Sequence, residues 1–195
     1  MKRKLWTLLL ALGAALALCV GAGAADFTGW TALMDAHSGQ ALADGNYYLN
    51  NDVTISQTIT VSGTVTLDLN GHVLQYKNDS TKGSVIKVES GGQLTIEDSN
   101  TSNLSHKFNP DGKLWVLDDA SGTEAVTGGV ITGGKGYPFH LISSTVNCGG
   151  GVYIAPSGQL TMTGGNIIGC SAEFGGGVCI YPRQNGEQIQ FSMSG

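Results

Sequence analysis

One segment of this chain occurs twice, with its two copies 66 residues apart. Residues 86–96 read IKVESGGQLTI and residues 152–162 read VYIAPSGQLTM, so Gly-Gln-Leu-Thr is unchanged between them. A shorter repeat, GGGVYI at 149–154 and GGGVCI at 175–180, has a spacing of 26 residues. Segments this short cannot bury their apolar side chains alone, and repeats of such periods stack on one another to share a core. The sequence therefore predicts a stack of structural repeats.

Pairs of apolar residues separated by one residue mark the predicted strands of these repeats. Residues i and i+2 of a strand lie on the same face, so both members of a pair can point into a shared core. The first series of pairs is Ile59/Val61, Ile86/Val88, Trp115/Leu117, Val152/Ile154 and Val178/Ile180. The second series is Val65/Leu67, Leu94/Ile96, Glu124/Val126, Leu160/Met162 and Phe191/Met193, in which only Glu124 is charged. A third match relates TGGVI at 127–131 to TGGNI at 163–167.

Glycine is placed where such repeats need corners. The chain has 30 glycines in 195 residues, roughly twice the usual share. Many fall between the predicted strands, in five groups: Gly128-Gly129, Gly133-Gly134, Gly149 to Gly151, Gly164-Gly165 and Gly175 to Gly177. Glycine allows positive φ and therefore sharp turns. We predict an all-β parallel solenoid; an antiparallel sandwich is the alternative, but it does not predict a Gly-Gly-Gly start at fixed phase.

Three of these segments also carry a resemblance to a known family. The segments are GGGVYI at 149–154, GQLTMTGG at 158–165 and LDLNGHVL at 67–74. They resemble secreted bacterial right-handed parallel β-helix proteins of the pectate-lyase-like fold, especially adhesin-like surface proteins, over residues 52–195. The resemblance implies a right-handed β-helix of about five coils that acts in adhesion, glycan binding or host-surface binding without being an enzyme. Its alternative implication is a fragment of a polysaccharide lyase or glycoside hydrolase.

The first 25 residues have the pattern of a secretory signal peptide. Lys2, Arg3 and Lys4 precede an apolar run at 5–20, and Ala22-Gly23-Ala24 matches a cleavage site. The run is shorter than the ~20 residues that span a bilayer, so no membrane span is expected after cleavage. Cleavage leaves 7 basic against 15 acidic residues, a balance that excludes nucleic acid as a partner. We expect a secreted or cell-surface protein.

The two ends of the predicted solenoid differ. Residues 26–51 are expected to form an N-terminal cap with a short amphipathic helix over Trp30–His37, because its large residues lie at i, i+3, i+4 and i+7. We expect His37 to be a packed cap residue rather than a ligand. At the other end, Phe191 to Gly195 read as an open coil, which predicts a truncated stack that could continue into further repeats or meet another copy.

Two longer segments, 98–113 and 133–147, interrupt the repeats. Both are expected to follow a second strand and to leave the stack on the same side, where insertions of repeat proteins often form the binding surface. The candidate ligand-binding residues, which could stack on a sugar of a glycan, are Phe108, Tyr137, Phe139 and His140.

Few residues predict chemistry. Asp68 and Glu97 occupy matching positions of neighbouring repeats and are weak candidates for a cation, but two carboxylates are few for Ca²⁺, so neither a metal site nor a cofactor is predicted. The pair Asp118-Asp119 resembles the acidic pair of family glycosidases, but it lacks their partner groups, so no catalytic residue is assigned. Cys148, Cys170 and Cys179 are compatible with one disulfide or with three thiols.

Overall fold

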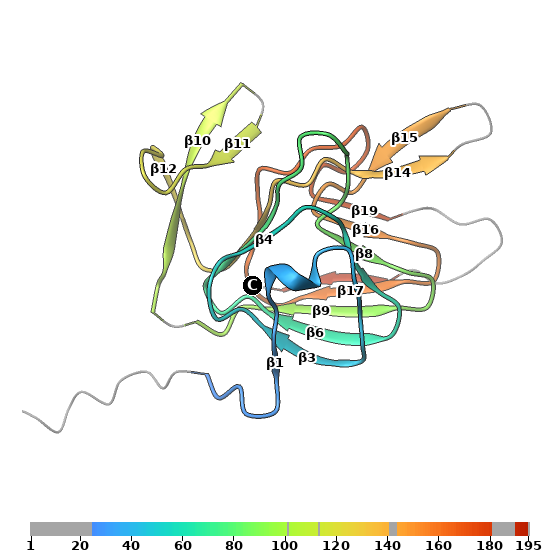
Figure 1. Ribbon diagram of the computed structural model, residues 1–195, viewed down its shortest axis with the longest axis horizontal. Helices are drawn as coiled ribbons and strands as arrows, with labels where there is room; N and C mark the ends of the chain where they lie inside the picture. Colours follow the sequence, from blue (N-terminus) through green and yellow to red (C-terminus); the bar gives the residue numbers. More distant parts are fainter. Residues whose placement is uncertain (1–24, 101, 113, 141–143, 181–189, 195) are drawn as a thin grey trace, which may run out of the picture.

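The computed structural model describes residues 25–100, 102–112, 114–140, 144–180 and 190–194. Within these ranges the chain is all-β, and its single helical element is the 3-10 helix η1 (Asp35–His37) (Figure 1). No helix in the described part of the chain is long and apolar enough to cross a membrane. The predicted signal peptide lies outside the described residues, apart from Ala25.

Three parallel sheets form the body of the molecule. In spatial order, the first sheet contains β1 (Thr31–Ala32), β3 (Gly45–Tyr48), β6 (Thr64–Asp68), β9 (Gln93–Glu97), β17 (Gln159–Met162) and β20 (Gln190–Met193). The second contains β2 (Ala41–Leu42), β5 (Ile59–Val61), β8 (Ile86–Val88), β16 (Val152–Ile154) and β19 (Val178–Ile180). The third contains β4 (Val53–Ile55), β7 (Val73–Tyr76), β13 (Val130–Thr132) and β18 (Asn166–Ile167). Parallel sheets in this order are compatible with the predicted solenoid.

The strand register confirms that the duplicated segments stack directly. Leu94 lies opposite Leu160 and Ile96 opposite Met162, while Ile86 lies opposite Val152. The third match is confirmed too, because β13 pairs with β18 in the register of the two TGG segments. The 66-residue offset is therefore the distance between adjacent strands.

The middle row of the predicted columns is wrong. Trp115/Leu117 and Glu124/Val126 belong to an antiparallel sheet of β10 (Ser105–Asp111), β11 (Leu114–Leu117) and β12 (Glu124–Thr127), which we call the lobe. The chain leaves the stack after β9 and returns at β13, so β9 pairs with β17 with nothing between them. The lobe was mistaken for a coil because its length is close to one repeat period.

A single carboxylate closes the base of the lobe. Asp98 Oδ2 accepts a hydrogen bond from the Gly129 amide at 2.6 Å, which brings together the residues where the chain leaves and re-enters the stack. Asp98 Oδ1 accepts another from the Gly71 amide, also at 2.6 Å. The lobe is thus an insertion whose two ends meet on the preceding turn.

The predicted capping helix is absent. Thr31 and Ala32 form strand β1 and pair with Tyr47 and Tyr48, and the Leu33 amide continues the pattern by donating to the Tyr48 carbonyl oxygen at 2.8 Å. Leu33 is fully buried but Met34 is 51% exposed, so the apolar stripe of a helix is not followed. The open edge of β3 supplies backbone partners that outweigh a weak helical pattern.

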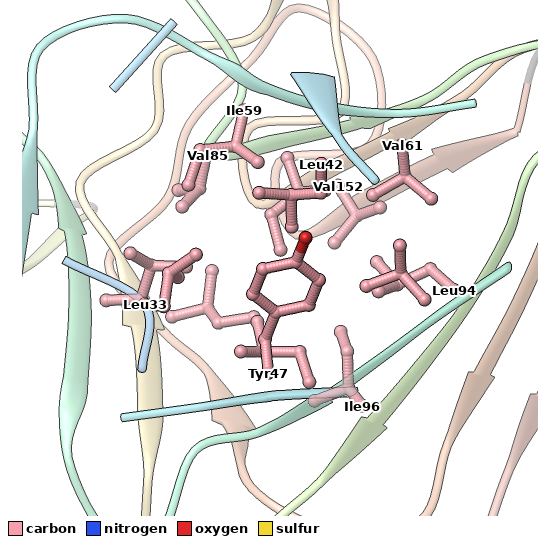
Figure 2. Packing of buried hydrophobic residues seen from close by; sticks show 14 of the residues in the cluster. Leu33, Leu42, Tyr47, Ile59, Val61, Val85, Leu94, Ile96 and Val152 are labelled. Atoms are coloured by element: carbon pink, nitrogen blue, oxygen red, sulfur yellow. The ribbon is translucent and has the colours of Figure 1, made fainter. Parts of the chain in front are cut away.

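Residues 41–55, assigned to the cap in the sequence, supply one strand to each sheet. Strands β2, β3 and β4 pair with β5, β6 and β7. Tyr47 of β3 is buried, and its ring lies among aliphatic side chains that include Leu33, Leu42 and Leu94 (Figure 2). Its hydroxyl donates to the Ala43 carbonyl oxygen at 3.1 Å. His37 packs edge-on against this ring.

The five predicted glycine corners are confirmed in the backbone. Each group contains one residue of positive φ: Gly128, Gly133, Gly149, Gly165 and Gly175. Some neighbours lie where two turns approach too closely for a side chain, because a Cβ at Gly134 would collide with the carbonyl oxygen of Gly150. Glycine thus serves both the turning and the stacking of the chain.

The register can be tested with a disulfide trap. Thr95→Cys with Thr161→Cys, in a chain whose three native cysteines of residues 26–195 are replaced by alanine, should form an intramolecular disulfide, because these residues are paired and paired Cα atoms of adjacent strands are about 4.8 Å apart. Thr95→Cys with Ala125→Cys is the matched control, since Ala125 would be the partner if the lobe were a coil. Peptide mapping by mass spectrometry should find the first crosslink; a dominant 95–125 crosslink would restore the sequence register.

Candidate functional site

Two excursions leave the sheets. The lobe lies between β9 and β13, and a hairpin of β14 (Tyr137–His140) and β15 (Thr145–Cys148) lies between β13 and β16. Only the lobe therefore follows a strand of the first sheet, as was predicted for both. The lobe and the hairpin stand well apart in Figure 1, at the upper left and the upper right. The structure does not bring the candidate rings of the two segments together.

Phe108 is unavailable to a ligand in this structure. Its side chain is fully buried and clusters with Val73 of β7 and Val130 of β13. Phe108 thus attaches the lobe to the third sheet. An exposed aromatic residue had been expected here, but the alternation of β10 turns this ring inward.

The hairpin rings are partly used for packing. Tyr137 stacks on Tyr153 of β16 with ring centroids 5.2 Å apart, and its hydroxyl accepts a hydrogen bond from Lys87 Nζ at 3.2 Å. The same ammonium group lies 4.4 Å from the Tyr137 ring centroid, a cation–π distance. Although burial lowers the pKa of Lys87, the bonds from its ammonium group to Glu89 and Tyr137 outweigh this and raise it above its usual value.

The outer part of the hairpin is more open. Phe139 is half-buried against Cys148, Tyr153 and Ala155. His140 is exposed, and its Nδ1 lies 2.9 Å from the Thr145 hydroxyl across the hairpin. Of the four candidate residues, His140 is thus the one presented fully to solvent.

A groove beside Trp115 was missed in the sequence. It has a volume of about 320 Å³ and is lined by Leu114 and Trp115 of the lobe and by Ile168, Gly169 and Cys170 of the body. A Cβ at Gly169 would collide with the Trp115 carbonyl oxygen, so glycine is required for the lobe to approach the body here. A neighbouring hollow of about 160 Å³ adds polar side chains: Gln75, Thr132, Lys135 and Ser171.

Trp115 gives this groove an accessible aromatic surface. It is 38% exposed, and its ring centroid lies 6.3 Å from that of buried Phe108. Leu114 and Val116 on the same strand are 39% and 48% exposed. Pairing of β11 with β10 holds this strand in place. The sequence gave Trp115 a core position, and only the antiparallel pairing of the lobe moves it to the surface.

The weak cation candidates Asp68 and Glu97 lie opposite each other, as predicted. Asp68 is buried, and its Oδ1 accepts hydrogen bonds from the amides of Asn70 at 2.7 Å and Ser99 at 3.0 Å. Among the described residues no third ligand of a metal-binding type gathers around this pair. The Asp68 carboxylate therefore stabilises turns in this structure.

The acidic pair Asp118-Asp119 lies in the turn between β11 and β12. The hydroxyl and then the amide of Ser121, which donate to Asp118, hold the pKa of this carboxyl below its usual value. Asp118 also accepts a hydrogen bond from the Asn109 side-chain amide at 2.8 Å. A carboxyl group kept ionised in this way is unsuited to act as a general acid.

The cysteines Cys148, Cys170 and Cys179 are free thiols in this structure. Burial, followed by the proximity of Cys179, raises the pKa of Cys148 to about 11. Burial also raises the pKa of Cys170 to about 11. Because the thiolate is the nucleophile, neither of these two groups is poised for nucleophilic catalysis at neutral pH.

Comparison of the chain with protein-family models, with curated proteins and with solved structures finds no match. The interpretation of the surface therefore depends on the residues themselves. The groove beside Trp115 is the feature that combines an exposed aromatic side chain with nearby polar groups.

Thiol labelling tests the state of the two buried cysteines. At pH 8 a thiol of pKa about 11 is ionised roughly 100-fold less than one of pKa near 9. Iodoacetamide should therefore label Cys148 and Cys170 at least about 100-fold more slowly in the folded chain than in urea, as measured by peptide mass spectrometry over time. Rapid labelling of Cys148 in the folded chain would mean that it is an activated nucleophile.

Proposed function

We propose that this protein is a secreted or cell-surface right-handed β-helix module that binds glycans, without being an enzyme. Support for the β-helix comes from the order of the strands, because successive segments add to the first, second and third parallel sheets in turn. Support for the hand comes from a general rule, since connections between parallel strands of one sheet are right-handed in about 98% of cases.

The observation that carries glycan binding is the exposed Trp115 in the groove between the lobe and the body. A sugar ring has apolar C–H faces, which can pack on an aromatic ring, and hydroxyl groups at its edge, which need hydrogen bonds. Gln75, Lys135 and Ser171 line the adjoining hollow and offer amide, ammonium and hydroxyl groups. The groove thus offers both kinds of contact to one extended ligand.

Lysine and the surrounding charge favour some glycans over others. The net charge of the chain is −5, so a highly acidic polysaccharide would be repelled over most of the surface. Lys135 Nζ is already engaged by the Asn78 carbonyl oxygen at 2.8 Å and lies 3.5 Å from Asp79. Neutral glycans are therefore the expected ligands.

A polysaccharide lyase or glycoside hydrolase is the competing function. Catalysis would require an acid and a base held around one bond, but the Asp118 carboxylate is occupied by Ser121 and Asn109. This arrangement favours a binding module. Depolymerisation of pectin, alginate or a glycosaminoglycan by the protein, lost on Asp118→Ala, would support the enzyme instead.

A glycan array with Trp115→Ala tests the proposal. The wild-type protein should bind a set of neutral glycans, and Trp115→Ala should weaken binding at least tenfold, because truncating a central tryptophan in an interface typically costs about 2 kcal/mol or more. Affinities for the best array ligand would be measured by isothermal titration calorimetry.

Trp30→Ala is the matched control, because Trp30 packs against Phe27 beside β1, at the opposite edge of the first sheet from β20. It should leave glycan affinity unchanged. Tyr137→Ala distinguishes the groove from the hairpin: loss of binding there alone would move the site to the hairpin. An array without ligands, or equal loss in both tryptophan variants, would refute the groove as a glycan site.

A further inference from the structure

A buried histidine joins the lobe to the turn before β7. The side chain of His106 on β10 is 9% exposed, and its Nε2 lies 2.7 Å from the Gly71 carbonyl oxygen. A carbonyl oxygen can only accept a hydrogen bond, so Nε2 carries the donated proton. In the neutral ring, Nδ1 is then left with a lone pair.

This lone pair faces two carboxylates. His106 Nδ1 lies 3.7 Å from Asp119 Oδ2, which is longer than a hydrogen bond. Asp52 approaches from the segment between β3 and β4, and the nearest ligand atoms of Asp52, His106 and Asp119 all lie within 4.8 Å of one another. Three electron-pair donors thus converge on one point, and an arrangement of this kind needs a cation at its centre.

We infer that Asp52, His106 and Asp119 bind one divalent transition-metal ion. One imidazole nitrogen and two carboxylate oxygens are a ligand set suited to Zn²⁺, which accepts three protein ligands and leaves a position for water. Ligands about 2.0–2.1 Å from a tetrahedral ion are about 3.3 Å apart, so a small rotation of the two exposed aspartates brings the present spacing into range. Ca²⁺ prefers six to eight oxygen ligands and fits this set poorly.

Each ligand is oriented by a contact outside the group. The Val73 amide donates to Asp52 Oδ1 at 2.9 Å, and the Lys107 amide donates to Asp119 Oδ1 at 2.7 Å. The Gly71 carbonyl oxygen fixes His106 in the same way. Outer contacts of this type orient the ligands of metal sites and tune their affinity. His72, whose Nδ1 lies 3.5 Å from Asp52 Oδ1, is a further neighbour of the site.

The ion would connect segments that are far apart in sequence. Asp52 belongs to the body, whereas His106 and Asp119 belong to the lobe. Metal binding would therefore fix the lobe against the body and stabilise the folded state by mass action. This site is separate from the groove and does not depend on glycan binding.

Metal titration tests the inference. The purified chain, treated with EDTA and then desalted, should bind Zn²⁺ with a stoichiometry of one in isothermal titration calorimetry, and Zn²⁺ should raise its Tm. Co²⁺ at the same site should give visible absorption bands, whereas Ca²⁺ at equal concentration should not raise the Tm. Asp119→Asn and His106→Gln should each lower the Zn²⁺ affinity at least tenfold.

The controls remove the same chemical groups elsewhere. Asp111→Asn takes an exposed carboxylate from the same lobe, and His140→Gln takes an exposed imidazole from the hairpin; both should retain wild-type affinity. Asp119→Asn can still accept the Lys107 hydrogen bond, so it should fold, as circular dichroism would verify. Absence of stoichiometric Zn²⁺ binding, or equal affinity in Asp119→Asn and Asp111→Asn, would overturn the inference.

Discussion

Direct pairing between strands from distant parts of the sequence is the constraint on which this structure depends. Strand β9 pairs with β17 and β8 with β16, although about 60 residues separate the members of each pair. Each strand has only three to five residues, too few to be stable without neighbours on both edges. Everything else in the chain is arranged so that these short strands remain in contact. Segments that do not add to the stack must leave it and return without separating its turns.

The functional surfaces arise from those departures. The lobe forms its own antiparallel sheet and contacts the body through buried Phe108, so Trp115 is held over Gly169 at the edge of the groove. The hairpin is attached by Tyr137, which contacts both Tyr153 and Lys87. In each case one aromatic residue attaches the excursion to the body, and its neighbours remain available to ligands. Binding capacity and packing are thus divided between adjacent residues.

Much of the stack could be predicted from the sequence, because identical residues recur at positions that lie opposite each other, as Leu94 and Leu160 do. The lobe could not be, because an insertion about one period long imitates a repeat when only apolar spacing is considered. The helix failed for a similar reason: local spacing around Leu33 ignores the free edge of β3. The groove and the histidine site depend on which residues the lobe brings to the body, and no local pattern contains that information.

The carboxylate of Asp98 has a consequence for how this scaffold can change. By binding Gly71 and Gly129 at once, it makes the junction of the lobe independent of the length of what lies between. The entropy of closing a loop rises only slowly with its length, so longer or shorter inserts at this junction would cost the stack little. The same position is therefore a natural graft point, where evolution or an engineer can exchange one recognition element for another while the parallel sheets stay as they are.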